Sequence, residues 1–337
     1  MLSQQLASPQ FSLPEEVVAH LGAVQAQEYR LMRWAVAMRT RKPSASAFCR
    51  AYDSGRIIRV HLFRGTWQLV SGDDYRWMMD LCSGKARRVI EGWMHANHIS
   101  IPDEEYLRIK DIMVRCAGDL GSVTKEDIVK ALARYDITMD DHRLSYHIRM
   151  AELDGTLCSG NLHPLKATYS LAVEKVPEAA ALNNDEAMAL LTRKYFQSHS
   201  PATLEDFIWW TGMNAGECLR GIAALGSELR TERWNDTEFY IHENARIRGF
   251  RSGSALLLPP YDEYLIGYKS RGIVLPEEHR HRAHNNSGNF YPIVLRDGIV
   301  CGCWKPFEKT LTADLFDGSS PDFLSPAWNT YRTFLKR

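Results

Sequence analysis

Residues 124–136 of this chain are TKEDIVKALARYD, and residues 140–155 are DDHRLSYHIRMAELDG. In the first stretch Thr124 is followed three residues later by Asp127, a spacing close to the capping box that begins many helices. The second stretch has an apolar stripe at helical spacing and stops at a glycine, which predicts a second helix. The apolar faces would carry Ile128, Leu132 and Tyr135 in the first helix and Leu144, Ile148 and Ala151 in the second.

A predicted hairpin follows these two helices. Residues 156–172, TLCSGNLHPLKATYSLA, place Gly, Asn and Pro between two short runs that suit β-strands. The order helix, helix, hairpin is typical of the winged-helix variant of the helix-turn-helix.

A later segment repeats this order. Residues 200–226 predict a helix with Thr203 as its cap, a break at Gly212 and a second helix. Residues 229–243 then predict a hairpin that turns at Asn235-Asp236.

An earlier segment follows a similar plan. Residues 44–55 predict a helix that ends at a glycine, and residues 56–71 predict a strand pair around Arg64-Gly65. From residue 246 onward, short β-prone runs are separated by Pro-Pro and Asp-Gly turns. We therefore predict an α+β fold of three tandem winged-helix units followed by a small β-rich C-terminal domain. The expected domains are residues 1–100, 101–180, 181–245 and 246–337.

The charge of the chain is balanced overall but uneven along its length. Lysine and arginine number 41, as do aspartate and glutamate, which argues against a strongly basic, non-specific nucleic-acid binder. Residues 1–100 hold 13 basic against 8 acidic residues, whereas residues 101–180 hold 10 against 14. A surface for a polyanion should therefore involve the N-terminal third.

The sequence predicts a cytoplasmic protein without a metal or cofactor. It begins without the basic and apolar regions of a secretion signal, and no run approaches the length of a membrane span. Seven cysteines, an odd number, favour reduced thiols over a disulfide framework. Cys301 and Cys303 follow a histidine-rich stretch at 279–284, but the paired ligand spacings of a zinc site are missing.

Two glutamines interrupt an apolar helical pattern near the N-terminus. Gln25 and Gln27 stand in LGAVQAQ, between PEEVVAHL and LMRWAVAM, whose apolar stripes are out of phase. We predict a helix break between the two stripes, which would let residues two apart share a side. The spacing leaves two roles open: a functional pair, or amides that tie down loop backbone.

Basic residues gather in two places that could contact nucleic acid. The first covers residues 39–67, where an aromatic residue is interleaved with basic ones, as in surfaces that hold phosphates and stack an unpaired base. The second is the expected outer face of residues 141–153, which is either a recognition helix or an ordinary solvated face. The residues predicted to contact DNA are Arg39, Arg41, Lys42, Arg59, His61, Arg64, Trp67, Arg143 and His147.

Five stretches carry a family resemblance. LGAVQAQ (21–27), HLFRGTWQLV (61–70), AELDGTLCSG (151–160), residues 194–212 and LLPPYDEYLIGYKSRG (257–272) resemble the tandem winged-helix proteins that include the AlkZ-type DNA glycosylases. Those enzymes unhook interstrand crosslinks and remove bulky N-alkylated purines. The resemblance extends over roughly residues 12–304.

The resemblance implies a function for the glutamines. The family's catalytic Gln-x-Gln motif falls on Gln25 and Gln27, and the implied partner is damaged double-stranded DNA, bound by a monomer without a cofactor. Family members often have His where this chain has Gln68. Asp262 and Glu263 could support the site as carboxylates, or form a structural pair with Lys269 or Arg271.

Amide side chains suit one particular chemistry. Glutamine does not ionise, so it can orient a water molecule but cannot act as a general base. That is sufficient when the leaving group is activated, because a purine alkylated at N7 carries positive charge and leaves as a neutral base. The sequence thus predicts a monofunctional DNA glycosylase. The alternatives are a non-catalytic DNA-binding regulator on the same scaffold, or a protein-interaction scaffold.

Overall fold

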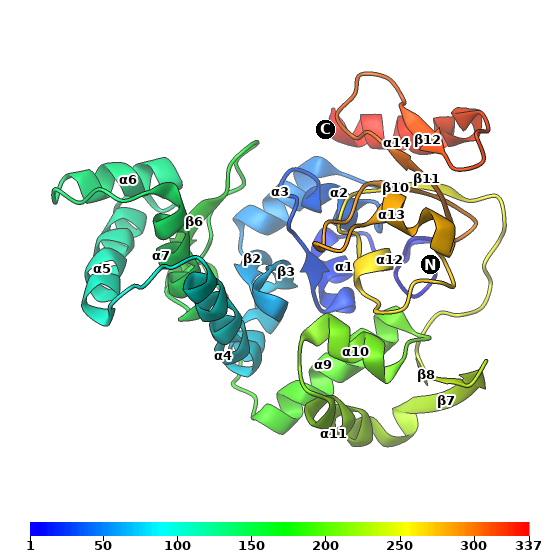
Figure 1. Cartoon of the computed structure of the whole chain (residues 1–337), viewed down its shortest axis with the longest axis horizontal. Helices are drawn as coiled ribbons and strands as arrows, with labels where there is room; N and C mark the ends of the chain where they lie inside the picture. Colours follow the sequence, from blue (N-terminus) through cyan, green and yellow to red (C-terminus); the bar gives the residue numbers. More distant parts are fainter. Residues whose placement is uncertain (337) are drawn as a thin grey trace. The chain divides into compact units, whose positions relative to one another are not determined.

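The computed structural model describes residues 1–336 and has an α+β fold (Figure 1). The chain packs as two compact units, one formed by Met1–Phe48 with Met188–Arg337 and the other by Cys49–Ala187. Helices α3 (Ala45–Asp53) and α9 (Asn184–His199) lie where the chain passes from one unit to the other. The expected division into four sequence domains remains a prediction.

The Cys49–Ala187 unit is built from helices around two small antiparallel sheets. Strand β2 pairs with β3, and β4, β6 and β5 form a three-stranded sheet in that order. Its elements are β2 (Ile57–His61), β3 (Trp67–Ser71), α4 (Gly72–Ala96), α5 (Asp103–Leu120), β4 (Val123–Thr124), α6 (Lys125–Ala133), α7 (Asp141–Leu153), β5 (Leu157–Ser159), β6 (Thr168–Leu171) and α8 (Ala172–Lys175).

The helix, helix, hairpin order predicted for residues 124–172 is confirmed. Thr124 caps α6, because its hydroxyl accepts from the Asp127 amide at 3.2 Å while the Asp127 carboxylate accepts from the Thr124 amide at 3.0 Å. The stripe of α7 is buried as predicted, but Tyr135 is 45% exposed because α6 ends at Ala133. The buried residues of the stripe are Leu144, Ile148 and Ala151.

Truncating this stripe should destabilise the protein. Leu144 is 1% exposed and packs in the cluster formed by α5, α6 and α7, so Leu144→Ala should cost about 2–5 kcal/mol of unfolding free energy. Val129→Ala on α6 is the matched control, since Val129 is 49% exposed and its truncation should leave the melting temperature nearly unchanged. Equal destabilisation by the two substitutions would contradict the assigned helix faces.

The other unit joins the N-terminal 48 residues to the C-terminal part of the chain. Its elements are α1 (Pro14–Leu21), β1 (Val24–Gln25), α2 (Met32–Ala37), α10 (Leu204–Thr211), α11 (Ala215–Leu225), β7 (Leu229–Trp234), β8 (Thr237–His242), β9 (Ala255–Leu258), α12 (Glu263–Ile266), α13 (Arg280–Ala283), β10 (Ile293–Arg296), β11 (Ile299–Trp304), β12 (Ala313–Leu315) and α14 (Ser325–Leu335). The predicted cap at Thr203, the left-handed stop at Gly212 and the hairpin turn at Asn235-Asp236 are all present.

The predicted β-rich region forms a four-stranded antiparallel sheet. Its strand order is β12-β11-β10-β9, and α14 lies beside it (Figure 1). Trp34 of α2 joins the core of this sheet, donating its indole N–H to the Leu257 carbonyl at 2.9 Å and packing edge-on to Tyr331. Residues near the N-terminus and the C-terminal sheet therefore share one hydrophobic core.

Candidate functional site

The predicted break in the glutamine segment is confirmed. Helix α1 ends at Leu21, the two-residue strand β1 covers Val24–Gln25, and a bend follows at Gln27. Gly22 makes the break possible: its φ is +79°, and a Cβ there would lie 3.2 Å from the Cβ of Lys194. The sequence Leu-Gly therefore ends the helix before the glutamines.

The two glutamines have different environments. The Gln25 side chain is 5% exposed, whereas Gln27 is exposed to solvent. A buried amide can form part of a fixed hydrogen-bond network, and an exposed amide can reach a solvent molecule or a ligand. The segment therefore holds one amide inside the protein and presents the other at the surface.

A buried carboxylate holds the backbone of this segment. Glu263, at the start of α12, is 1% exposed, and its Oε1 accepts from the Gln25 amide N–H at 2.7 Å. Its Oε2 accepts from the Trp210 indole N–H at 3.0 Å and lies 3.5 Å from Nε2 of His199. Because both oxygens are engaged and buried, Glu263 suits the positioning of β1 better than proton transfer to a ligand.

The neighbouring carboxylate makes a buried ion pair. Asp262 accepts from both terminal nitrogens of Arg39, at 2.9 and 2.7 Å, and caps α12 through the Tyr264 amide. Arg39 is completely buried and also donates to the carbonyls of Gln4 and Ala35. The DNA contact predicted for Arg39 is therefore wrong, because its charge is inside the protein and neutralised.

The structure also corrects the expected partners of these carboxylates. Lys269 and Arg271 were the candidate partners, but the Lys269 amide donates to Asp206 and Nε of Arg271 donates to the Leu265 carbonyl. Asp262 instead pairs with Arg39. The contacts of Gln25 with Glu263 and of Arg39 with Asp262 join residues 238 and 223 positions apart, and nothing in the local sequence signals them.

Two predicted DNA contacts on β2 are buried. Arg59 is 4% exposed and its guanidinium lies over the Trp67 ring, 4.2 Å from the centroid. His61 is 1% exposed and contacts the Glu152 carboxylate, while burial lowers the pKa of its imidazole against the opposing effect of Glu152. The predictions for Arg59 and His61 are wrong, and one face of Trp67 is covered by Arg59 instead of being open to a base.

The predicted recognition face of α7 is also partly buried. His147 is fully buried and lies 3.0 Å from the Glu105 carboxylate, and burial lowers the pKa of its imidazole. Arg143 donates to the same carboxylate from Nε at 2.7 Å. The DNA contact predicted for His147 is wrong, and Arg143 links α7 to α5.

Three of the predicted basic residues remain accessible to a polyanion. Arg41 and Lys42 are exposed in the segment between α2 and α3. Arg64 is partly exposed at the tip of the β2–β3 hairpin, where its φ is +54°. These three residues are the members of the predicted basic region that best fit a DNA surface.

No helix within residues 1–336 is both long and apolar enough to cross a bilayer. The same residues contain no group of three or more His, Cys, Asp and Glu side chains placed to hold a metal ion.

Comparison with known proteins places the chain in one family. The model of the family described as "DNA glycosylase AlkZ-like" matches residues 18–318, so the chain belongs to this family of DNA glycosylases. One curated relative is the "Interstrand DNA cross-link repair glycosylase" of Streptomyces sahachiroi, 24% identical over 327 residues that cover 89% of this chain and 84% of the relative.

A solved structure shows the same fold. The "Streptomyces sahachiroi DNA glycosylase AlkZ" superposes with a TM-score of 0.77 at 20% sequence identity. The match covers 99% of this chain and 94% of that structure. The architecture is therefore shared over nearly the whole length of both chains.

Proposed function

We propose that this chain is a monofunctional DNA glycosylase that hydrolyses the N-glycosidic bond of N7-alkylated purines. The observation that carries the proposal is the family match over residues 18–318, which includes a Gln-x-Gln segment outside any helix. The relative in Streptomyces sahachiroi is named an interstrand DNA cross-link repair glycosylase, which makes crosslinked DNA a second candidate substrate. The enzyme acts as a cytoplasmic monomer on double-stranded DNA.

The two glutamines have separate roles in this proposal. Gln27 is exposed and orients the attacking water molecule. Gln25 is buried and shares the hydrogen-bond network that fixes the segment, with Glu263 holding its backbone amide at 2.7 Å. Glu263 therefore holds the main chain of the segment that carries Gln27.

This chemistry needs no strong base. An N7-alkylated purine departs as a neutral molecule, and the oxocarbenium-like sugar that remains is trapped by one positioned water, which then loses its extra proton to solvent. The buried, doubly engaged state of Glu263 agrees with a mechanism in which this carboxylate does not remove a proton from that water. Unmodified purines would leave too slowly to be excised.

The proposal is tested by base excision. Duplex DNA with one N7-methylguanine is incubated with the protein, and abasic sites are then cleaved with alkali. Strand cleavage at the lesion should exceed spontaneous depurination, and a matched duplex with unmodified guanine should remain intact. Cleavage no faster than in the protein-free sample would contradict the proposal.

We further propose that three tandem winged-helix units hold the duplex and that Arg64 at the β2–β3 tip contacts phosphate. Duplex affinity should fall steeply with salt, and Arg64→Ala should make the slope of log K against log salt shallower by about one. Arg332→Ala, on the exposed side of α14, is the charge-matched control and should leave the slope unchanged. Affinity that does not respond to salt would remove both the enzyme and the regulator hypotheses.

A further inference from the structure

A basic segment outside the predicted DNA region connects β8 to β9. Residues 243–254 form neither helix nor strand and include Arg246, Arg248 and Arg251, with Phe250 among them. No aspartate or glutamate occurs between Glu243 and Asp262. The segment therefore concentrates positive charge and an aromatic ring in a chain whose overall charge is zero.

The arginines of this segment are not neutralised by the rest of the protein. Arg248 and Arg251 are exposed, and within residues 1–336 no carboxylate forms an ion pair with either. Arg246 donates to the Ser8 carbonyl at 2.9 Å, a contact that leaves its charge uncompensated. Such guanidinium groups are the side chains that most often contact phosphate.

Both ends of the segment are fixed to the body of its unit. Arg246 binds the backbone at Ser8, and the amides of Gly253 and Ser254 donate to Asp297 Oδ1 at 2.6 and 2.8 Å. Asp297 lies in the turn between β10 and β11. The loop is therefore held at its two ends while Arg248 and Phe250 remain accessible.

An apolar groove borders the segment. A cavity of about 330 Å³ is lined by Ile247, Phe250 and Ile299, and it shares Tyr264, Ile273 and other residues with a second cavity of about 300 Å³. Exposed apolar side chains rim both cavities: Trp234 and Ile273 are each 56% exposed, and Phe250 is 41% exposed. Exposed apolar side chains that are grouped around a cavity in this way are typical of a binding site.

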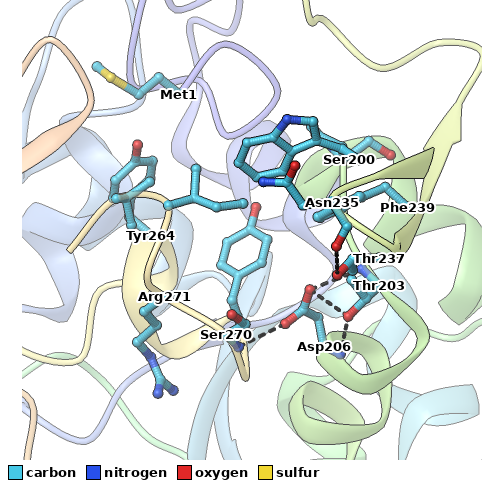
Figure 2. Close-up of a pocket in the computed structure, with 15 residues that line it drawn as sticks. Met1, Ser200, Thr203, Asp206, Asn235, Thr237, Phe239, Tyr264, Ser270 and Arg271 are labelled. Atoms are coloured by element: carbon cyan, nitrogen blue, oxygen red, sulfur yellow. Dashed lines mark hydrogen bonds between the residues drawn. The ribbon is translucent and has the colours of Figure 1, made fainter. Parts of the chain in front are cut away.

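The second cavity presents aromatic walls from two directions (Figure 2). Asn235, Thr237 and Phe239 of the β7–β8 hairpin lie on one side, and Tyr264 of α12 lies on the other. Trp234, next to the hairpin turn, belongs to the same lining. The volume is at the lower end of the range for small-ligand pockets, which suits a single planar group.

The polar groups of the cavity favour an uncharged ligand group. The Asp206 carboxylate accepts from Thr203 at 2.9 Å and from the amides of Lys269 and Ser270 at 2.8 and 3.2 Å, so its oxygens are engaged within the protein. Figure 2 shows the Arg271 side chain directed away from Tyr264 and Asn235. The cavity thus offers aromatic surface, and the one carboxylate in its lining is already hydrogen-bonded within the protein.

We propose that this surface binds a DNA strand at unpaired nucleotides, with Arg248 and Arg251 on the phosphates and bases stacked on Trp234 and on Phe250. Proteins that bind single strands without sequence preference use basic side chains to contact the phosphates and exposed aromatic rings to stack the bases. This surface has both kinds of side chain. The inference rests on the proposed function for the choice of DNA as the ligand. This second DNA-binding surface lies outside residues 1–100 and would recognise DNA in which base pairing is disrupted.

The test measures binding without chemistry. Fluorescence anisotropy compares a lesion-free duplex containing a three-nucleotide bubble with the same duplex fully paired. Trp234→Ala and Phe250→Ala should each weaken bubble binding about tenfold or more, the scale of one lost stacking contact, and leave paired-duplex binding within about twofold. Arg248→Ala/Arg251→Ala should weaken binding to both probes and make the salt slope shallower by about two.

The matched control is Arg332→Ala/Lys336→Ala, which removes two exposed basic residues at the C-terminal end of the same unit and should change neither preference nor slope. Thermal melts check that each variant is folded. Equal affinity of wild-type protein for bubble and paired duplex, or aromatic variants that bind the bubble like wild type, would overturn the proposal. Because the probes carry no lesion, absence of glycosylase activity would leave this binding result intact.

Discussion

Gln27→Ala should lower the single-turnover rate of N7-alkylguanine excision by about 10²-fold or more, the scale of losing one group that positions the nucleophile or stabilises charge. Gln27 is exposed in a bend after β1, so its truncation removes an amide from the surface without opening the core. DNA affinity and melting temperature should therefore remain close to those of wild type.

Gln10→Ala is the control for this substitution. Gln10 is also an exposed glutamine in non-helical chain before α1, and it should keep the full excision rate. If Gln27→Ala instead lowers the melting temperature while the folded fraction keeps wild-type activity, the glutamines tie down loop backbone and the catalytic proposal fails.

Arg39→Ala should produce the largest loss of stability. Arg39 is 0% and Asp262 3% exposed, so removing the guanidinium leaves a buried carboxylate without its counter-charge, at a cost of about 3–5 kcal/mol. Urea unfolding measures this cost. Arg41→Ala, two residues away and exposed, should stay within about 0.5 kcal/mol of wild type.

Measuring both stability and duplex affinity of the Arg39→Ala variant distinguishes a structural role of Arg39 from a role in DNA binding. An Arg39→Ala variant as stable as wild type, but weaker in duplex affinity, would restore the original phosphate-contact hypothesis and contradict the buried ion pair. Because Asp262 is the N-cap of α12 and Glu263 is its first residue, a destabilised Arg39 variant should also displace the segment that Glu263 holds through Gln25.

Local features of the fold could be predicted because their signals lie within a few residues. Thr124 and Thr203 each have an aspartate three positions later, and both form the expected caps. The Asn235-Asp236 turn and the break after Leu21 follow from residues that adopt or permit positive φ at those points. Each of these features depends on the chain nearby rather than on distant packing.

The long helices were not predicted. Helix α4 has 25 residues and a surface rich in charge, and the repeated helix, helix, hairpin plan has no position for α4, α5 and α9, which precede or follow the repeats. The pattern taken from residues 124–172 contains only two short helices and a hairpin. Additional helices between the copies have no counterpart in the pattern.

The wrong predictions of DNA contacts for Arg59 and His61 have a different cause. Every residue of β2 is buried, so the usual alternation of inward and outward side chains gave no exposed side for Arg59 and His61. Arg59 packs over the ring of Trp67, and His61 contacts Glu152, which is 91 residues away in the sequence. Basic composition predicted a polyanion surface there, but long-range partners determine which basic residues reach solvent.

The most direct test of the central claim identifies the products of the reaction by mass spectrometry. Wild-type protein is incubated with duplex DNA carrying one N7-methylguanine, and both the released small molecules and the intact strands are analysed before any alkaline treatment. The account predicts free 7-methylguanine in equal amount to an unbroken strand with one abasic site, and no such release by Gln27→Ala on the same timescale. Binding of the duplex with no base released above the protein-free sample would contradict it and favour the non-catalytic regulator.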